Sequence, residues 1–235
     1  MFVKCLKKVP AGGWMSNLKL YYHITVQPYW QEFTSEKIDR MKSVGLWDAF
    51  SDIVFCVHDN VDQLRQEYQT DVRVRFIDHP EAVRPYNEQY TNRTIKQQTD
   101  ADTSEYYILR LHNKGINHFN TPTWPANEII TEEIDQCTID CWRTIVEKLD
   151  QGYEAVGPNW VKQPWPHFKG NVWWATSNYV KRLTILKPPH ELGFQQQITG
   201  GGWTIHDAES WIGTAGPKAW DTLRHTDQIG DHPDL

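Results

Sequence analysis

The regular alternation of strand-like and helical patterns constrains the fold of this chain more than any other feature. Apolar runs rich in β-branched and aromatic residues, bounded by turn residues, predict strands at 18–26, 52–60, 71–78, 106–112 and 153–161. Helical spacing predicts helices at 35–45, 61–69, 128–149 and 177–183, and one through Tyr90 and Ile95. Strands that alternate with helices predict an α/β fold, a Rossmann-type and mostly parallel sheet with helices on both faces.

Length and composition narrow the class of protein. The 235 residues suffice for one large domain, and no repeat or low-complexity linker divides them, so a single domain over 1–235 is expected. The net charge of −6 argues against nucleic acid as a partner, since nucleic acid selects a basic face. No apolar run is long enough for a membrane span, and the first residues hold no apolar segment of signal-peptide length, so we expect a cytoplasmic protein.

Polar residues follow the predicted strands where a parallel sheet binds ligands. Such sheets bind at the carboxyl ends of their strands, near the point where the strand order reverses. The side chains and backbone there are expected to contact a donor ligand. They are His23 after the first strand, Asp59 after the second, and His112, Asn113, Lys114 and Gly115 after the fourth.

The sequence LHNKG at the end of the fourth strand suits a diphosphate. Lys114 would supply a point charge, and Gly115 would let the backbone approach the phosphate oxygens. The chain has no Walker pattern and no Gly-x-Gly-x-x-Gly pattern, so P-loop and dinucleotide sites lack support. An ordinary turn after a strand is the alternative explanation of these residues.

A second candidate site is the stretch HFKGNVWWA, from His167 to Ala175. Sugars need directed hydrogen bonds for their hydroxyls and a flat apolar surface for their C–H faces, and this mixture of residues offers both. The chain contains twelve tryptophans, so a tryptophan-rich core is the alternative explanation of the adjacent Trp173 and Trp174. The residues expected to bind a sugar or acceptor are His167, Lys169, Gly170, Asn171, Trp173 and Trp174.

Five elements of the chain form a set, spread over roughly residues 20–212: Tyr22-His23-Ile24, Leu111 to Gly115, His167 to Ala175, Tyr179-Val180 and Glu209-Ser210-Trp211-Ile212. Together they resemble a family of small glycosyltransferase-like proteins from bacteria and large viruses. The resemblance implies a GT-A-type fold, with a nucleotide-sugar donor over residues 18–115 and a glycan or similar hydroxyl acceptor over residues 116–212. Asn113 and Lys169 depart from the family pattern, which has Thr and Ser there. The Gly- and Pro-rich tail at 213–235 is expected to be irregular.

Metal dependence is left open by the sequence. Many GT-A enzymes hold Mn²⁺ or Mg²⁺ on the donor diphosphate with an Asp-x-Asp motif after the fourth strand. Here Asp100-Ala-Asp102 precedes that strand, so we expect it in a solvated loop at the opposite edge of the sheet. Either Lys114 replaces the metal, or ligands such as His112 and residues of the C-terminal part complete a site. Those residues are His206, Asp207 and His225.

A carboxylate base is expected in the segment GGGWTIHDAESWIG. Inverting transfer needs a base for the proton of the acceptor hydroxyl, and Glu209 is the first candidate, ahead of Asp207. Carboxylates at a helix start also stabilise the helix dipole, which is the alternative role. Gly200 to Gly202 are expected to form a loop that closes on the donor.

The leading hypothesis is therefore a glycosyltransferase that moves a sugar from a nucleotide diphosphate sugar to a hydroxyl acceptor. A non-catalytic carbohydrate-binding protein is the first alternative, although such modules are usually all-β. A glycoside hydrolase is the second, and it needs two carboxylates about 5–10 Å apart across one bond. Asp207 and Glu209 are only two residues apart, so they would not face each other across a substrate.

Overall fold

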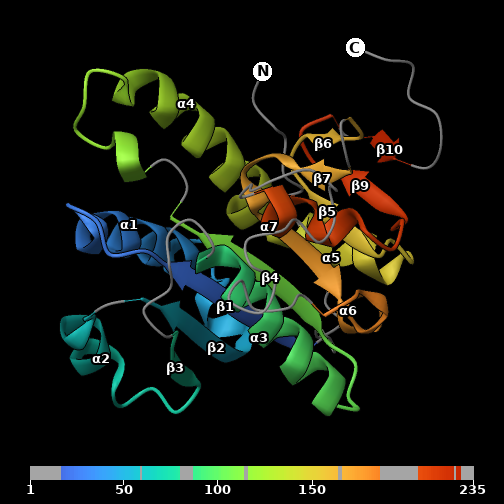
Figure 1. The fold of residues 1–235 in the computed structure, drawn as a ribbon, viewed down its shortest axis with the longest axis horizontal. Helices are drawn as coiled ribbons and strands as arrows, with labels where there is room; N and C mark the ends of the chain where they lie inside the picture. The colour runs from blue at the N-terminus through green and yellow to red at the C-terminus, as the bar shows by residue number, and fades with distance from the viewer. Residues whose placement is uncertain are drawn as a thin grey trace, which may run out of the picture.

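The computed structural model describes residues 17–58, 60–79, 87–113, 116–163, 166–185, 206–224 and 226–228. Its centre is an eight-stranded sheet with the order β10-β9-β5-β8-β4-β1-β2-β3 (Figure 1). The strands of this sheet are β1 (Leu18–Ile24), β2 (Phe50–Val57), β3 (Val74–Asp78), β4 (Tyr107–His112), β5 (Ala155–Gly157), β8 (Trp173–Thr176), β9 (Ala219–Asp221) and β10 (Thr226–Gln228). A separate two-stranded sheet contains β6 (Trp160–Val161) and β7 (His167–Phe168).

Six of the eight strands run in the same direction. β1 pairs in parallel with β2 and β4, β2 with β3, and β5 with β9. β8 is antiparallel to both of its neighbours, β4 and β5, and β10 is antiparallel to β9. The prediction of a mostly parallel α/β sheet is confirmed, and β8 is the antiparallel strand that sequence patterns did not reveal.

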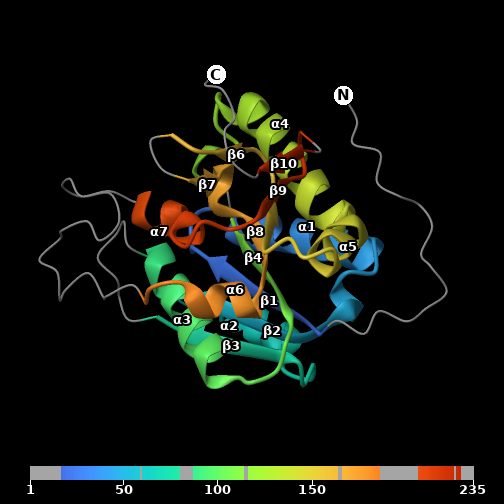
Figure 2. The same ribbon diagram turned by 90° about the vertical axis from the view of Figure 1, so that its right-hand side faces the viewer.

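Helices cover both faces of the sheet (Figure 2). One face carries α1 (Trp30–Ser43), α2 (Asp62–Tyr68), α4 (Trp124–Asp135) and α5 (Trp142–Asp150), and the other carries α3 (Asn87–Ala101), α6 (Ser177–Arg182) and α7 (His206–Ser210). Because successive side chains of a strand point to opposite faces, Tyr22 enters the first core and Tyr21 the second. Within the described ranges, no helix has the length and apolar character needed to cross a bilayer.

Three predicted boundaries are corrected. The helix expected over 128–149 is divided into α4 and α5 by a five-residue π-helical turn, Gln136–Asp140. The strand expected over 153–161 is divided into β5 and β6, because Asn159 adopts a left-handed conformation with φ 51°. The C-terminal tail is not wholly irregular, since β9 enters the main sheet beside β5. Periodicity of apolar residues cannot signal a single inserted helical residue or a partner strand far along the chain.

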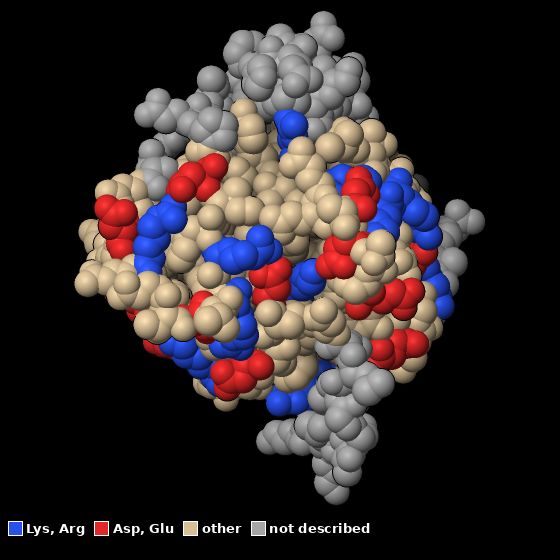
Figure 3. All heavy atoms as spheres, turned by 90° about the horizontal axis from the view of Figure 1, so that it is seen from below, with Lys and Arg blue, Asp and Glu red and all other residues tan. Residues whose placement is uncertain are grey.

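The face seen in Figure 3 carries Lys and Arg side chains interspersed with Asp and Glu rather than a broad basic area. Ion pairs join neighbouring strands of the sheet, such as Arg75 of β3 with Asp52 of β2 at 2.7 Å. Exposed pairs of this kind contribute little to stability, about 0–1 kcal/mol each.

Candidate functional site

A row of buried histidines marks the carboxyl ends of the four neighbouring parallel strands. His23 lies near the end of β1, His58 follows β2, His79 follows β3 and His112 ends β4, and each is more than nine-tenths buried. The ring centroids of His23 and His58 are 5.2 Å apart, and those of His58 and His79 are 5.1 Å apart. The rings of His23, His58 and His79 are therefore neighbours along this edge of the sheet.

The order of the strands reverses between β1 and β4. The chain passes from β1 to β2 and then β3 on one side, and it returns to the other side of β1 as β4. His23 and His112 are partners in register across this point. In open α/β sheets this reversal is where ligands bind, just outside the carboxyl ends of the strands.

Glu88 of α3 is the centre of a charged cluster at that point. Its Oε2 accepts hydrogen bonds from Nη2 of Arg110 at 2.7 Å and from Nδ2 of Asn171 at 2.5 Å. Its Oε1 lies 3.2 Å from Nδ1 of His112. The Arg110 side chain is fully buried, whereas that of Glu88 is 29% exposed. We call Glu88, Arg110 and His112 the edge cluster.

The hydrogen bonds of His112 determine its protonation state. Nδ1 faces the Glu88 carboxylate, and Nε2 lies 2.5 Å from the backbone oxygen of Gly170. Both of these partners can only accept, so both ring nitrogens must carry a proton and His112 is an imidazolium. The edge cluster thus holds two cations around one carboxylate and has a net charge of +1.

The charge of Glu88 is maintained by its neighbours. Burial raises the pKa of Glu88, but the positive charges of His112 and Arg110 outweigh that effect and hold the pKa well below its usual range. Glu88 is therefore ionised at neutral pH, as its contacts with three donors require.

A left-handed turn at Gly170 and Asn171 completes the cluster. Gly170 has φ 81° and Asn171 has φ 50°. This conformation directs the Gly170 oxygen to His112 and the Asn171 oxygen to Nη1 of Arg110. Gly and Asn are the residue types that adopt it at least cost. The sequence KGN in HFKGNVWWA therefore builds the edge cluster rather than a sugar-binding surface.

Trp173, Trp174 and Asn171, which are predicted to contact a sugar, lie in the core. All three side chains are fully buried, at 0% exposure. The Trp174 indole donates to the Thr138 backbone oxygen at 3.0 Å, and the Trp173 indole donates to Oδ1 of Asn171 at 3.3 Å. The two rings enter the cores on opposite faces of β8, so they pack the sheet and present no face to a ligand.

His23 and Asn113, two residues expected to contact the donor ligand, form hydrogen bonds that join elements of the fold. The ring nitrogens of His23 contact Oγ1 of Thr91 at 2.8 Å and Oγ1 of Thr25 at 3.1 Å. Burial lowers the pKa of His23 well below its usual value, so this ring is neutral. Asn113 accepts from the Tyr22 hydroxyl at 2.5 Å and donates to Thr34 of α1 at 3.1 Å. These two hydrogen bonds explain the presence of Asn113, where the family pattern has Thr.

The remaining predicted residues lie around the same edge or outside the described residues. His167 is partly exposed in β7, and Lys169 is exposed beside the Gly170 turn. Glu209 is on α7, which packs against α3 and the Gly170 turn. Nδ2 of Asn92 on α3 donates a hydrogen bond to the backbone oxygen of Ala208 on α7, at 2.9 Å. Outside the described residues lie Asp59, Lys114, Gly115, Gly200 to Gly202, His225 and the side chains of His206 and Asp207.

The described residues do not fit Mn²⁺ or Mg²⁺. They contain no group of three or more His, Cys, Asp or Glu side chains placed to hold a metal ion. Both oxygens of Glu88, the carboxylate of the edge cluster, are already occupied by cations or an amide. Asp102 pairs with Lys19 at 2.6 Å near the start of β1, at the opposite end of the strands, as expected, but Asp100 lies in the last turn of α3 and not in a loop.

Glu88 and Arg110 were missed in the sequence, although one signal was present. Arg110 lies inside the apolar strand YILRLH and is fully buried. A charge in such a strand needs a partner, because an unpaired buried charge is very costly. The sequence indicates that a carboxylate must face Arg110 but not which one.

No family model and no curated protein matches the chain. Among solved structures, the chain is similar to the crystal structure of 4-diphosphocytidyl-2C-methyl-D-erythritol synthase from Anaerococcus prevotii DSM 20548. The identity is 12% and the TM-score 0.35, over 71% of this chain and 72% of that chain.

Proposed function

We propose that this chain is a GT-A-type glycosyltransferase whose nucleotide diphosphate sugar donor lies across the carboxyl ends of β1 and β4. The observation that carries the proposal is the edge cluster, with its net charge of +1 at the reversal of strand order. A nucleoside diphosphate is the ligand whose charge such a position would attract, and fixed cations in a buried setting act on it strongly.

The proposed reaction uses the edge cluster for the leaving group. The acceptor oxygen attacks the anomeric carbon, and the bond from that carbon to the β-phosphate oxygen breaks. The nucleoside diphosphate leaves with the electron pair, and the charge that develops on it is stabilised through space by the buried cations His112 and Arg110. Lys114, the residue after Asn113, is proposed to add a cation at the same place. Cations placed in advance stabilise such a transition state without reorganisation.

The proposed base is Glu209, with Asp207 as the second candidate. α7 packs against the Gly170 turn, so Glu209 belongs to the group of elements that surrounds the edge cluster. The base would take the proton of the acceptor hydroxyl as the new bond forms, on the face opposite the leaving diphosphate, which gives inversion. The described residues do not fit a metal ion, and none is assigned a part in the proposed reaction.

The alternatives have lost support. The non-catalytic carbohydrate-binding protein depended on the tryptophans as platforms, and Trp173 and Trp174 are core residues. A glycoside hydrolase would use a carboxylate at the cleavage site, and the oxygens of Glu88 are occupied by the edge cluster and Asn171.

Titration calorimetry with UDP, GDP, CDP and dTDP, each compared with its nucleoside, tests the proposal. At least one diphosphate should bind, and its nucleoside should bind far more weakly. His112→Gln removes one positive charge near the diphosphate and should weaken its binding about tenfold, on the scale of one charge acting through space near the protein surface. His118→Gln is the matched control, because His118 is exposed and lies outside the edge cluster. If no diphosphate binds, or if His112→Gln binds it as well as the wild type, the proposed site is wrong.

A further inference from the structure

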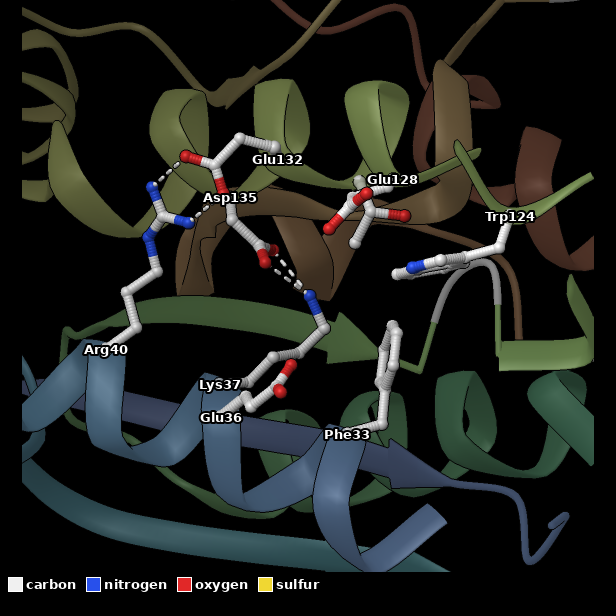
Figure 4. A pocket seen from close by; sticks show the side chains of 9 residues that line it. Phe33, Glu36, Lys37, Arg40, Trp124, Glu128, Glu132 and Asp135 are labelled. Atoms are coloured by element: carbon white, nitrogen blue, oxygen red, sulfur yellow. Dashed lines mark hydrogen bonds and ion pairs between the residues drawn. The ribbon is translucent and has the colours of Figure 1, made fainter. Parts of the chain in front are cut away.

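A small cavity separates α1 from α4 on the face of the sheet opposite α3 (Figure 4). Its volume is about 130 Å³. This is below the range of about 300–1,000 Å³ usual for drug-sized ligands, so it would take a single small ring. The lining residues are Phe33, Glu36, Lys37, Arg40, Trp124, Glu128, Thr131, Glu132 and Asp135.

The inner wall of the cavity holds a buried ion pair. Nζ of Lys37 lies 2.6 Å from both carboxylate oxygens of Asp135, and the two side chains are only 4% and 8% exposed. Farther out, Arg40 forms an ion pair with Glu132 at 2.6 Å. Both donors and acceptors therefore reach the cavity at fixed positions.

Two aromatic rings close one end. Phe33 and Trp124 meet nearly edge to face, with centroids 6.0 Å apart and an interplanar angle of 70°. Phe33 is buried, while Trp124 is partly exposed beside the cavity (Figure 4). Trp124 thus offers the kind of partly open apolar face that Trp173 and Trp174 do not.

Glu36 on α1 and Glu128 on α4 lie between the two rings and the Arg40–Glu132 pair (Figure 4). Among the described residues, neither carboxylate takes part in a hydrogen bond or an ion pair. Loss of solvent, and then repulsion from Glu32 and Glu128, raises the pKa of Glu36. A ligand that donates hydrogen bonds to these oxygens would reduce the repulsion between them.

The geometry points to a neutral monosaccharide unit as the ligand of this cavity, the acceptor of the proposed transferase. Its hydroxyls would donate to Glu36 and Glu128 and accept from Lys37 and Arg40, and its C–H face would lie on Trp124. An anion would meet four carboxylates against two cations, and a cation could pair with Glu36 and Glu128 but could accept no hydrogen bond from Lys37 or Arg40. A neutral polyol satisfies both kinds of group.

One chain of hydrogen bonds connects α1, which lines the cavity, to the strand ends of the proposed donor site. Thr34, next to Phe33 on α1, accepts from Asn113 at the end of β4, and Asn113 in turn accepts from Tyr22 of β1. The start of α1 therefore links the cavity to the strand ends where the diphosphate is proposed. This assignment as an acceptor site rests on the proposed function, whereas monosaccharide binding can be measured without it.

Saturation-transfer NMR with the methyl glycosides of glucose, galactose, mannose and N-acetylglucosamine tests the inference on the full chain. At least one glycoside should bind, and Glu36→Gln and Glu128→Gln should each weaken it about tenfold, as expected for one charge-assisted hydrogen bond. Glu133→Gln is the matched control, because Glu133 is exposed on α4 but does not line the cavity. All three variants should retain the nucleoside diphosphate affinity of the wild type.

Three results would overturn the inference. These are no binding of any glycoside, binding that neither cavity variant weakens, and binding of tetramethylammonium in place of the glycosides. Glycoside binding that is sensitive to Glu128→Gln, in a protein that binds no nucleoside diphosphate, would support the cavity and refute only the proposed donor site.

Discussion

Replacing Glu88 with Gln tests the edge cluster most directly. The substitution preserves the shape of the side chain and removes its charge. Nη2 of Arg110, at 2.7 Å, and Nδ1 of His112, at 3.2 Å, would then face a neutral amide. Arg110 is fully buried, so water cannot replace the interaction that it loses. We expect Glu88→Gln to fold with a clearly lower free energy of unfolding.

The magnitude follows from the burial of the partners. Removing one member of a buried ion pair costs about 3–5 kcal/mol. Glu88 is 29% exposed, and the Gln oxygen still accepts one hydrogen bond, so we take the lower end, about 3 kcal/mol. With a urea slope of about 3 kcal/mol per molar, the unfolding midpoint should fall by about 1 M.

The loss should depend on pH in a defined way. The pKa of folded Glu88 is depressed, so its contribution is present above the unfolded value of about 4.3 and disappears as the pH falls through the folded value. The difference in unfolding free energy between wild type and Glu88→Gln should therefore be full from about pH 5 upward and should shrink below about pH 4.

Urea unfolding followed by tryptophan fluorescence, between pH 3.5 and 8, measures both effects. The control Glu133→Gln removes an exposed carboxylate and should change the free energy by less than about 0.5 kcal/mol. If Glu88→Gln at pH 7 changes the free energy of unfolding by no more than this control, the buried cluster is refuted. A difference that grows as the pH falls from 5 to 3.5 would refute the assigned charge states.

Three further predictions concern the turn, the histidine row and the base. Asn171→Ala should lower the free energy of unfolding by about 1 kcal/mol more than Asn171→Gly, because Ala must adopt a positive φ; urea unfolding of the two variants checks this. Burial, and then His58, lowers the pKa of His79 to about 3. As the pH falls from about 6.5 to about 3, the unfolded state binds a proton that the folded state does not, so the free energy of unfolding should fall by about 1.4 kcal/mol per pH unit. His79→Phe should remove this contribution to the pH dependence. Glu209→Gln should leave diphosphate binding intact in calorimetry and abolish transfer from the donor, and transfer at the wild-type rate would place the base elsewhere.

The fold was predictable where the local pattern was strong. The apolar runs at β1, β2 and β4 are long and bounded by polar residues, and the carboxyl-end rule then placed His23 and His112 correctly at one edge. β8 was misinterpreted because both of its faces are covered. A strand buried on both faces shows no alternation, so two adjacent tryptophans looked like a binding surface.

The centre of the site was not predictable for a different reason. Glu88 lies 22 residues before Arg110 and 83 before Asn171 along the chain. Its segment reads as an ordinary polar helix, and only the packing of α3 over the strand ends brings the carboxylate to the buried arginine. Periodicity reports which face of an element is apolar, and it carries no information about which polar side chains meet across elements.

The charges of the two proposed sites separate their ligands. The edge cluster has two cations around one carboxylate. The cavity between α1 and α4 has four carboxylates against two cations, and the unpaired ones lie at its rim. A diphosphate is therefore drawn to the strand ends and repelled from the cavity, while an uncharged sugar ring experiences neither force and is selected by hydrogen bonds and by Trp124. If this is correct, Glu36→Gln with Glu128→Gln should let a monosaccharide phosphate, which has a single ring, compete with the glycoside for the cavity, and such competition already present in the wild type would refute the separation.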